Sequence, residues 1–235
     1  MGTSDARWLT TIVDETGSTN TDLLAAAAAG APDRTVLIAR HQTDGRGRLD
    51  RRWAAPPGAN LLVSLLFRDV PEHPHELTQR VALAAAKACT EIAGVVPTLK
   101  WPNDLLLDRL KLAGVLAQAG GSWANQVPGR GPSYVVVGIG LNVGWAPDGA
   151  ARLGDGYNPA DVLDQMLYAY DQLPPDITGI YRAALTTIGQ SVRVELPGSV
   201  VAGKALDVLP DGRLVVLDEC GITHRFDTGD VVHVR

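Results

Sequence analysis

Apolar and β-branched runs alternate along the chain with loops rich in glycine and proline. The mostly apolar run at residues 60–67 is long enough for a buried strand. Leu77, Val81 and Ala88 recur at helical spacing and predict an amphipathic helix over residues 75–92. The same criteria predict further strands at residues 8–13, 35–41, 98–101, 105–107, 112–118 and 134–143, and helices at residues 21–29, 158–173 and 176–189.

After residue 189 the pattern changes to short β-rich segments separated by Pro-Gly, Asp-Gly and single-glycine turns. This pattern is typical of a small β-barrel. We therefore predict an α+β domain at residues 1–189 and a barrel at residues 190–235. The predicted barrel strands are residues 192–196, 200–209, 213–218, 223–227 and 231–234.

The composition is that of an ordinary globular protein, with 46% hydrophobic and 20% charged residues. A net charge of −5 and the lack of a long basic run disfavour a protein that coats nucleic acid. The two cysteines, Cys89 and Cys220, indicate neither a zinc site nor a disulfide framework. The chain start has no signal-peptide core and no run reaches transmembrane length, so we expect a cytoplasmic location.

The arginine segment at residues 45–53 holds Arg46, Arg48, Arg51 and Arg52 beside two glycines. Glycine lets backbone N–H groups approach a ligand closely, and clustered arginines repel one another unless an anion is bound. The segment predicts an anion-binding loop. A solvated basic loop is the alternative, and the segment taken alone favours it.

A second candidate is the Lys-Trp-Pro-Asn-Asp sequence at residues 100–104. A strand stops at the proline and presents Asn103 and Asp104, whose side-chain oxygens are ligands that Mg²⁺ accepts. Lys111 follows in an otherwise apolar strand. It is either a functional cation or a strand-edge charge that reaches solvent, and residue type alone favours the second.

The sequence Gly-Ile-Gly-Leu-Asn at residues 138–142 lacks the third glycine and the following helix of a dinucleotide fingerprint. A strand whose glycines let a ligand's ring come close is the better interpretation. The histidines form no convincing metal set, and no Ser-His-Asp arrangement has a nucleophile elbow.

Taken in order, these segments resemble the biotin–protein ligase family, which is related to the lipoate ligases. The resemblance covers most of residues 8–145. It implies a mixed β-sheet flanked by helices, like a class II synthetase catalytic domain, followed by a small SH3-like β-barrel. The segments that carry it are residues 17–20 (Gly-Ser-Thr-Asn), Gln42, the arginine segment with Trp53, and residues 100–104, 111–114 and 138–142.

The resemblance also implies roles for individual residues. Lys111 and Arg48 are the expected catalytic cations, and Asp104 is the expected magnesium ligand. The implied biotin-binding residues are Ser18, Thr19, Asn20, Gln42, Gly45, Arg46, Gly47, Arg48, Lys111 and Gly114. The implied ATP-binding residues are Arg46, Arg48, Arg51, Trp53, Asn103, Lys111 and Asn142.

The implied reaction converts biotin to biotinyl-5′-AMP with ATP and Mg²⁺, then transfers biotin to a lysine of a biotin carboxyl carrier protein. Joining a carboxylate to the α-phosphate brings two anions together, so cations such as Lys111 and Arg48 suit the chemistry. A homodimer is left open, and neither DNA nor a membrane is an expected partner. Only a short segment precedes Trp8, which leads us to expect a ligase without the DNA-binding domain of the family's repressors.

Asp50 stands where many family members carry a glycine, which adds a negative charge beside the expected phosphate site. Three other functions are alternatives to a biotin ligase: a lipoate or octanoate ligase, a non-catalytic sensor that binds biotin, and a transcriptional repressor. The polar ureido-binding groups argue for biotin, because an alkyl chain needs no such cluster. Intact Lys111 and Arg48 argue against a sensor, and the acidic balance argues against a repressor.

Overall fold

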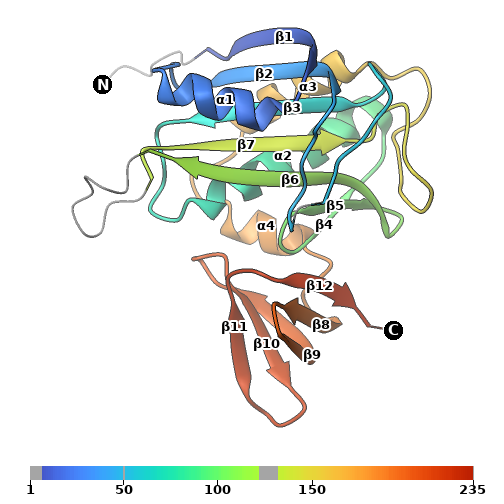
Figure 1. Cartoon of the computed structure of the whole chain (residues 1–235). Coiled ribbons are helices and arrows are strands. Elements are labelled where there is room, and N and C mark those ends of the chain that lie inside the picture. The colour runs from blue at the N-terminus through green and yellow to red at the C-terminus, as the bar shows by residue number, and fades with distance from the viewer. Residues whose placement is uncertain (1–6, 50, 122–131, 235) are drawn as a thin grey trace.

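The computed structural model describes residues 7–49, 51–121 and 132–234. A seven-stranded sheet runs in the order β1-β2-β3-β7-β6-β5-β4 (Figure 1). β1 pairs with β2 in parallel and the other neighbours pair antiparallel, so the sheet is mixed. Its strands are β1 (Leu9–Thr16), β2 (Thr35–Gln42), β3 (Leu61–Phe67), β4 (Thr98–Lys100), β5 (Asp104–Leu107), β6 (Leu110–Gly120) and β7 (Tyr134–Leu141).

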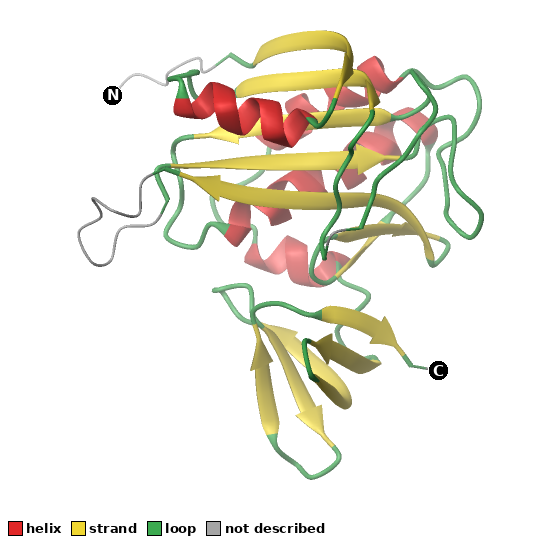
Figure 2. Ribbon diagram, viewed as in Figure 1, coloured by secondary structure: helices red, strands yellow, loops and turns green. Residues whose placement is uncertain are grey.

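Helices cover both faces of this sheet. α1 (Thr19–Ala28) lies on one face, while α2 (His75–Ala93) and α3 (Pro159–Asp171) pack together on the other (Figure 2). β3 contacts helices on both sides, and each of its residues is buried. This explains why its sequence is an apolar run without the alternation of a half-exposed strand.

A smaller sheet, here called the C-terminal sheet, follows α4 (Thr178–Ala184). Its five strands pair antiparallel in the order β11-β10-β9-β8-β12. They are β8 (Ser191–Leu196), β9 (Ser199–Val208), β10 (Leu214–Asp218), β11 (Thr223–Phe226) and β12 (Asp230–His233). The predicted α+β class, with a mixed sheet and a small β unit after it, is confirmed. The domain boundary at residue 190 stays a prediction.

Polar contacts fasten the C-terminal sheet to the α2, α4 and β4 end of the larger fold. Trp101 Nε1 donates to the Gly212 carbonyl at 2.9 Å, and Arg182 Nε donates to the Val208 carbonyl at 3.0 Å. One core contains buried apolar side chains from both sheets. The C-terminal sheet therefore holds a fixed position beside the loops at this end of the molecule (Figure 1).

The helix predicted at residues 176–189 is shorter than expected, because α4 ends at Ala184. Leu185 is extended (φ −78°, ψ 115°), and Thr186 donates from its backbone N and its Oγ1 to the Leu99 carbonyl, at 2.8 and 3.0 Å. Thr187 Oγ1 accepts from the Trp101 backbone N at 3.0 Å. These hydrogen bonds, to Leu99 in β4 and to Trp101 just after it, take the place of the hydrogen bonds of a further helical turn. None of the described helices is long and apolar enough to cross a membrane.

Candidate active site

A cavity of about 340 Å³ lies between the N-terminal end of α1, strands β6 and β7, and the segment that joins β2 to β3. All of the predicted site residues except Gly45 line this cavity. The predicted residues that line it are Ser18, Thr19, Asn20, Gln42, Arg46, Gly47, Arg48, Arg51, Trp53, Asn103, Asp104, Lys111, Gly114 and Asn142. The structure thus brings together predicted residues from four separate parts of the sequence.

At one end of the cavity, Gln42 binds the first turn of α1. Thr19 donates to Gln42 Oε1 from its backbone N at 2.7 Å and from its Oγ1 at 3.0 Å. Ser18 is the N-cap of α1 and is extended (φ −159°, ψ 125°), but its side chain makes no capping bond. Gln42 therefore satisfies one of the helix's free N–H groups, and the Ser18 hydroxyl is not used as a cap.

The amide of Asn20 is used inside the protein. Its Nδ2 donates to Gln118 Oε1 at 2.8 Å and to the Leu116 carbonyl at 3.2 Å. Its Oδ1 lies 2.6 Å from Ser64 Oγ, whose hydroxyl is also 2.7 Å from Thr19 Oγ1. Asn20 is therefore an anchor that ties α1 to β3 and β6, on which the polar end of the cavity rests.

The arginine segment is a loop whose two arms are joined by backbone hydrogen bonds, and it is here called the arginine hairpin. Gly47 N donates to the Arg51 carbonyl at 2.7 Å, and Trp53 N donates to the Gly45 carbonyl at 2.8 Å. A Cβ on Gly45 would lie 2.3 Å from the Trp53 carbonyl oxygen, so glycine is required at this close approach. Gly45 shapes the base of the hairpin without lining the cavity.

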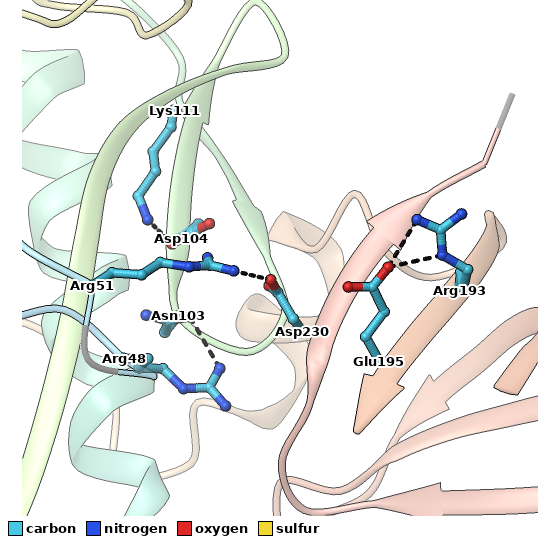
Figure 3. Close-up of polar contacts among 8 residues, drawn as sticks. All are labelled: Arg48, Arg51, Asn103, Asp104, Lys111, Arg193, Glu195 and Asp230. Atoms are coloured by element: carbon cyan, nitrogen blue, oxygen red, sulfur yellow. Dashed lines mark hydrogen bonds and ion pairs between the residues drawn. The ribbon is translucent and has the colours of Figure 1, made fainter. Parts of the chain in front are cut away.

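The hairpin arginines differ in their surroundings. Arg48 donates to Asn103 Oδ1 at 3.3 Å and to Thr228 Oγ1 at 3.0 Å, and Arg51 pairs with Asp230 (Figure 3). Burial lowers the pKa of Arg48, while the negative charges of Asp230 and then Asp104 act in the opposite direction. Arg48 and Arg51 thus face the cavity and the C-terminal sheet.

The other two hairpin arginines stay near the surface. Arg46 pairs with Asp44 at 3.2 Å, and Arg52 donates to the Thr43 carbonyl at 3.2 Å. Asp50, whose charge was expected beside the phosphates, lies outside the described residues.

Lys111 points into the cavity, where the interpretation as a strand-edge charge does not hold. Its Nζ lies 2.6 Å from Asp104 Oδ1, and the side chain is 38% exposed (Figure 3). That contact is an ion pair without hydrogen-bond geometry. The ammonium also lies 5.7 Å from the centre of the Trp53 ring. A cation next to an aromatic face and a single carboxylate suits an anionic ligand.

The glycines of β6 and β7 make room for side chains of the protein itself. A Cβ on Gly140 would lie 2.4 Å from Trp53 Cε2, and one on Gly138 would lie 2.1 Å from Asn20 Oδ1. Gly138 and Gly140 nevertheless line the cavity, so their contact with a ligand's ring stays a prediction. Trp53 Nε1 is buried without a hydrogen-bond partner among the described residues, which leaves it free to donate to a ligand.

Asn142 is buried and bonded within the protein. Its Nδ2 donates to the Ala151 carbonyl at 2.9 Å, and its Oδ1 accepts from Asn60 Nδ2 at 3.2 Å. Ala151 N in turn donates to the Lys111 carbonyl at 2.9 Å. Asn142 therefore holds the segment around Ala151 beside Lys111, and contact with nucleotide stays a prediction.

Comparison with known proteins shows the family of this chain. The Biotin/lipoate A/B protein ligase family model matches residues 13–142, and the Biotin protein ligase C terminal domain model matches residues 187–234. The biotin–[acetyl-CoA-carboxylase] ligase of Mycobacterium tuberculosis is 40% identical over 95% of this chain and 88% of that protein. The chain belongs to the biotin protein ligase family. The predicted resemblance is confirmed.

Two further relatives extend the comparison. A bifunctional ligase/repressor of Bacillus subtilis is 29% identical over 82% of this chain and 64% of that protein. The biotin protein ligase from Aquifex aeolicus in complex with biotin and ATP has a TM-score of 0.78 and 25% identity, covering 97% of this chain and 99% of that chain. The similarity in fold thus extends over the whole chain.

Sequence reasoning missed several residues of this family member's cavity. Ser64 supports Thr19 and Asn20 from the buried strand β3. Its hydroxyl within an apolar run was an available signal, since a buried hydroxyl needs a partner. Pro147 and Ala150 also line the cavity, in a segment to which the resemblance assigned no residues. Asp230 comes from the C-terminal sheet, and nothing in its local sequence marks it as a site residue.

The side chains that line the cavity offer few ligands for Mg²⁺. The described residues contain no group of three or more His, Cys, Asp or Glu side chains that could hold a metal. Asp104 offers one carboxylate, which pairs with Lys111, and the Asn103 oxygen beside it accepts from Arg48. Asp230, the other carboxylate that lines the cavity, pairs with Arg51. One carboxylate fits an ion held mainly by phosphate oxygens and water, and does not fit an all-protein metal site.

Proposed function

We propose that this chain is a biotin–[biotin carboxyl carrier protein] ligase that forms biotinyl-5′-AMP from biotin and ATP. One observation carries the proposal: a single cavity has neutral polar groups at one end and cations at the other. The polar end holds Ser18, Thr19 and Gln42, and the cationic end holds Arg48 and Lys111. This polarity suits an uncharged ureido ring linked by a chain to a carboxylate. The 40% identical relative is itself a biotin–[acetyl-CoA-carboxylase] ligase.

In the first step, a carboxylate oxygen of biotin attacks the α-phosphorus of ATP. The new bond joins carboxylate oxygen to phosphorus, and the bond from phosphorus to the bridging oxygen breaks to release pyrophosphate. Two anions must meet, so the barrier is largely electrostatic. Lys111 and Arg48 lower it by neutralising the charge, and no general base is needed because the carboxylate is already ionised.

Mg²⁺ belongs to this proposal through Asp104. Magnesium bound with ATP supplies further positive charge at the phosphates. Asp104 would be its protein ligand, with the remaining positions taken by phosphate and water. Because Asp104 also pairs with Lys111, it sets the position of the ammonium.

In the second step, the neutral amine of the acceptor lysine attacks the acyl carbon of biotinyl-5′-AMP. The amide bond forms, the bond from the acyl carbon to the phosphate oxygen breaks, and AMP leaves as the lysine nitrogen loses a proton. Water competes for the same carbon, so the intermediate must be shielded. The arginine hairpin and Trp53 lie where they can provide this cover.

The experiment is biotin-dependent exchange of labelled pyrophosphate into ATP, run with and without Mg²⁺ and with lipoate in place of biotin. Exchange with biotin supports the proposal. Exchange with lipoate alone makes the protein a lipoate ligase, and biotin binding without exchange makes it a sensor. Transfer is then assayed with a carrier protein of acetyl-CoA carboxylase. A cytoplasmic location and a homodimer stay predictions, which fractionation and light scattering can check.

A further inference from the structure

Two contacts join the arginine hairpin to one turn of the C-terminal sheet. Arg51 pairs with the carboxylate of Asp230 (Figure 3). Arg48 Nη2 donates to Thr228 Oγ1 at 3.0 Å. Thr228 lies in the turn between β11 and β12, and Asp230 begins β12. The partners are 179 and 180 residues apart along the chain of 235. Asp230 also lines the cavity, which makes it the residue that the C-terminal sheet contributes there.

The Asp230 carboxylate stands on a rigid support. Asp230 pairs with Glu195 on the ladder between β12 and β8. The preceding Gly229 has φ 142°, and a Cβ there would lie 2.8 Å from Val194 Cγ1, so the turn is shaped for glycine. Through Trp101 and Arg182 the C-terminal sheet is in turn fastened to the larger fold.

The hairpin is the less supported of the two partners. Its described backbone bonds lie within the hairpin, as in the pair from Gly47 to Arg51. The Arg51 side chain is 60% exposed, whereas that of Asp230 is 30% exposed. The ion pair therefore joins a largely exposed arginine of the hairpin to a carboxylate that is fixed on the ladder of the C-terminal sheet.

We propose that Asp230 is a positioning residue that holds the arginine hairpin over the cavity through Arg51, with Thr228 holding Arg48. The expected consequence of this positioning is retention of the acyl-adenylate, and that consequence rests on the proposed function. The C-terminal sheet then acts on the reaction through the hairpin. The contacts with Asp230 and Thr228 hold the hairpin closed over the cavity. The few backbone hydrogen bonds within the short hairpin cannot maintain that position alone.

The direct test measures how often the hairpin opens, using the protein itself. Trypsin cleaves after Arg48 only when the segment leaves its folded position, so limited trypsinolysis with mass spectrometry reports opening at that bond. We expect Asp230→Asn to speed this cleavage about two- to fivefold, the range that a partly exposed ion pair supports. Asp230→Glu should fall between the two, and Thr228→Val should also increase cleavage.

Glu195→Gln is the matched control. Glu195 is the cross-strand partner of Asp230, and it pairs with Arg193 on the same sheet, away from the cavity (Figure 3). Its substitution removes one carboxylate from the same ladder position and should leave cleavage after Arg48 unchanged. A general loosening of the C-terminal sheet would make both variants alike, which would overturn the proposal.

A second comparison isolates the pair. In an Arg51→Gln background, adding Asp230→Asn should cause no further increase in cleavage, because its partner is already gone. An equal increase in both backgrounds would show that Asp230 acts by another route. Arg51→Gln leaves the C-terminal sheet intact, so it carries the test even if Asp230→Asn lowers the melting temperature.

The functional readout is the rate at which the protein releases preformed biotinyl-5′-AMP in a chase. We expect release from Asp230→Asn to be about two- to fivefold faster than from the wild type and from Glu195→Gln. Unchanged release with increased cleavage would overturn the claimed consequence for the intermediate. Absence of biotin-dependent exchange in the wild type would refute the proposed function instead, while the trypsin result would still decide whether the pair holds the hairpin.

Discussion

Lys111 shows how a single residue joins the sheet to the chemistry. Its Cα belongs to β6, its carbonyl accepts from Ala151 N at 2.9 Å, and its ammonium lies 2.6 Å from Asp104. Gly114 keeps the space beside it open, since a Cβ there would lie 3.3 Å from the Lys111 Nζ. The backbone is fixed while the ammonium remains partly exposed to the cavity, which is the arrangement that an approaching anion requires.

We predict that Lys111→Ala reduces biotin-dependent pyrophosphate exchange by about 100-fold or more, as expected on removal of a cation that stabilises developing charge. The melting temperature should change little, because a partly exposed ion pair contributes little stability. Lys87→Ala is the control, since Lys87 pairs with Glu91 on the exposed side of α2. Near-normal exchange by Lys111→Ala would remove Lys111 from its proposed role.

Gly138 is a second residue whose position is set by close packing. We predict that Gly138→Ala destabilises the protein by about 1–3 kcal/mol, because the new methyl would overlap Asn20 Oδ1. It should also weaken biotin binding, since Asn20 lies in the first turn of α1, which Gln42 holds through Thr19. Urea unfolding and biotin titration measure the two effects. Gly179→Ala, with nothing within 4 Å of its Cβ, should cost no stability, and equal behaviour of the two variants would contradict this account.

Among the elements, β7 depends on the buried residue that precedes β3. Asn60 Oδ1 accepts from Val143 N at 3.0 Å and from Trp145 N at 3.2 Å, and its Nδ2 donates to Asn142. One side chain thus supplies the hydrogen bonds of the chain as it leaves the sheet after β7. This turn leads directly to the segment beside Lys111.

We predict that Asn60→Ala lowers the free energy of unfolding by about 2 kcal/mol, because buried backbone N–H groups lose their acceptor. Asn158→Ala is the comparison: Asn158 caps α3 from the surface through Ala160 N, and its loss should cost about 1 kcal/mol. Denaturant unfolding measures both. An Asn60→Ala cost no larger than that of Asn158→Ala would argue against the central position of Asn60.

On the scale of the whole molecule, the junction between the two parts contains a titratable contact. His75 at the start of α2 lies 3.2 Å through Nε2 from the Pro210 carbonyl in the turn between β9 and β10. Burial lowers the pKa of His75 from its ordinary 6.5 and His73 adds to this, while Pro210, Asp211 and Glu76 act in the opposite direction. The folded protein therefore holds this ring neutral at a pH where the unfolded chain protonates it.

We predict that stability falls as the pH drops below about 6.5, because protons then bind the unfolded chain more readily than the folded one. The contribution of His75 is fully present above that pH and is lost toward its lower folded pKa. His75→Gln, whose Nε2 can replace the ring donor without titrating, should show a smaller loss. Thermal unfolding between pH 7.5 and pH 5.5, on the order of one unit either side of the transition, measures it. Equal slopes for both proteins would exclude His75 as the cause.

The sequence by itself determined the local elements and the chemical inventory of the site. The apolar run of β3, the helical spacing in α2 and the short turn-bounded strands after residue 190 each depend on a period that neighbouring residues set. The arginine segment was recognisable from its residue types, whereas Gln42 and Lys111 were assigned through the ordered motifs that resemble the family. These properties can be read from the sequence without knowing which distant parts of the chain are in contact.

The tertiary structure alone decided how those groups are used. α4 ends at Ala184 because Leu99 and Trp101, distant in sequence, bind Thr186 and Thr187. The amides of Asn20 and Asn142 bond within the protein, although their sequence positions suggested ligand contacts. Asp230 reaches the cavity from the far end of the chain. Each outcome depends on which distant polar partner competes for a group, and local propensity carries no information about that partner.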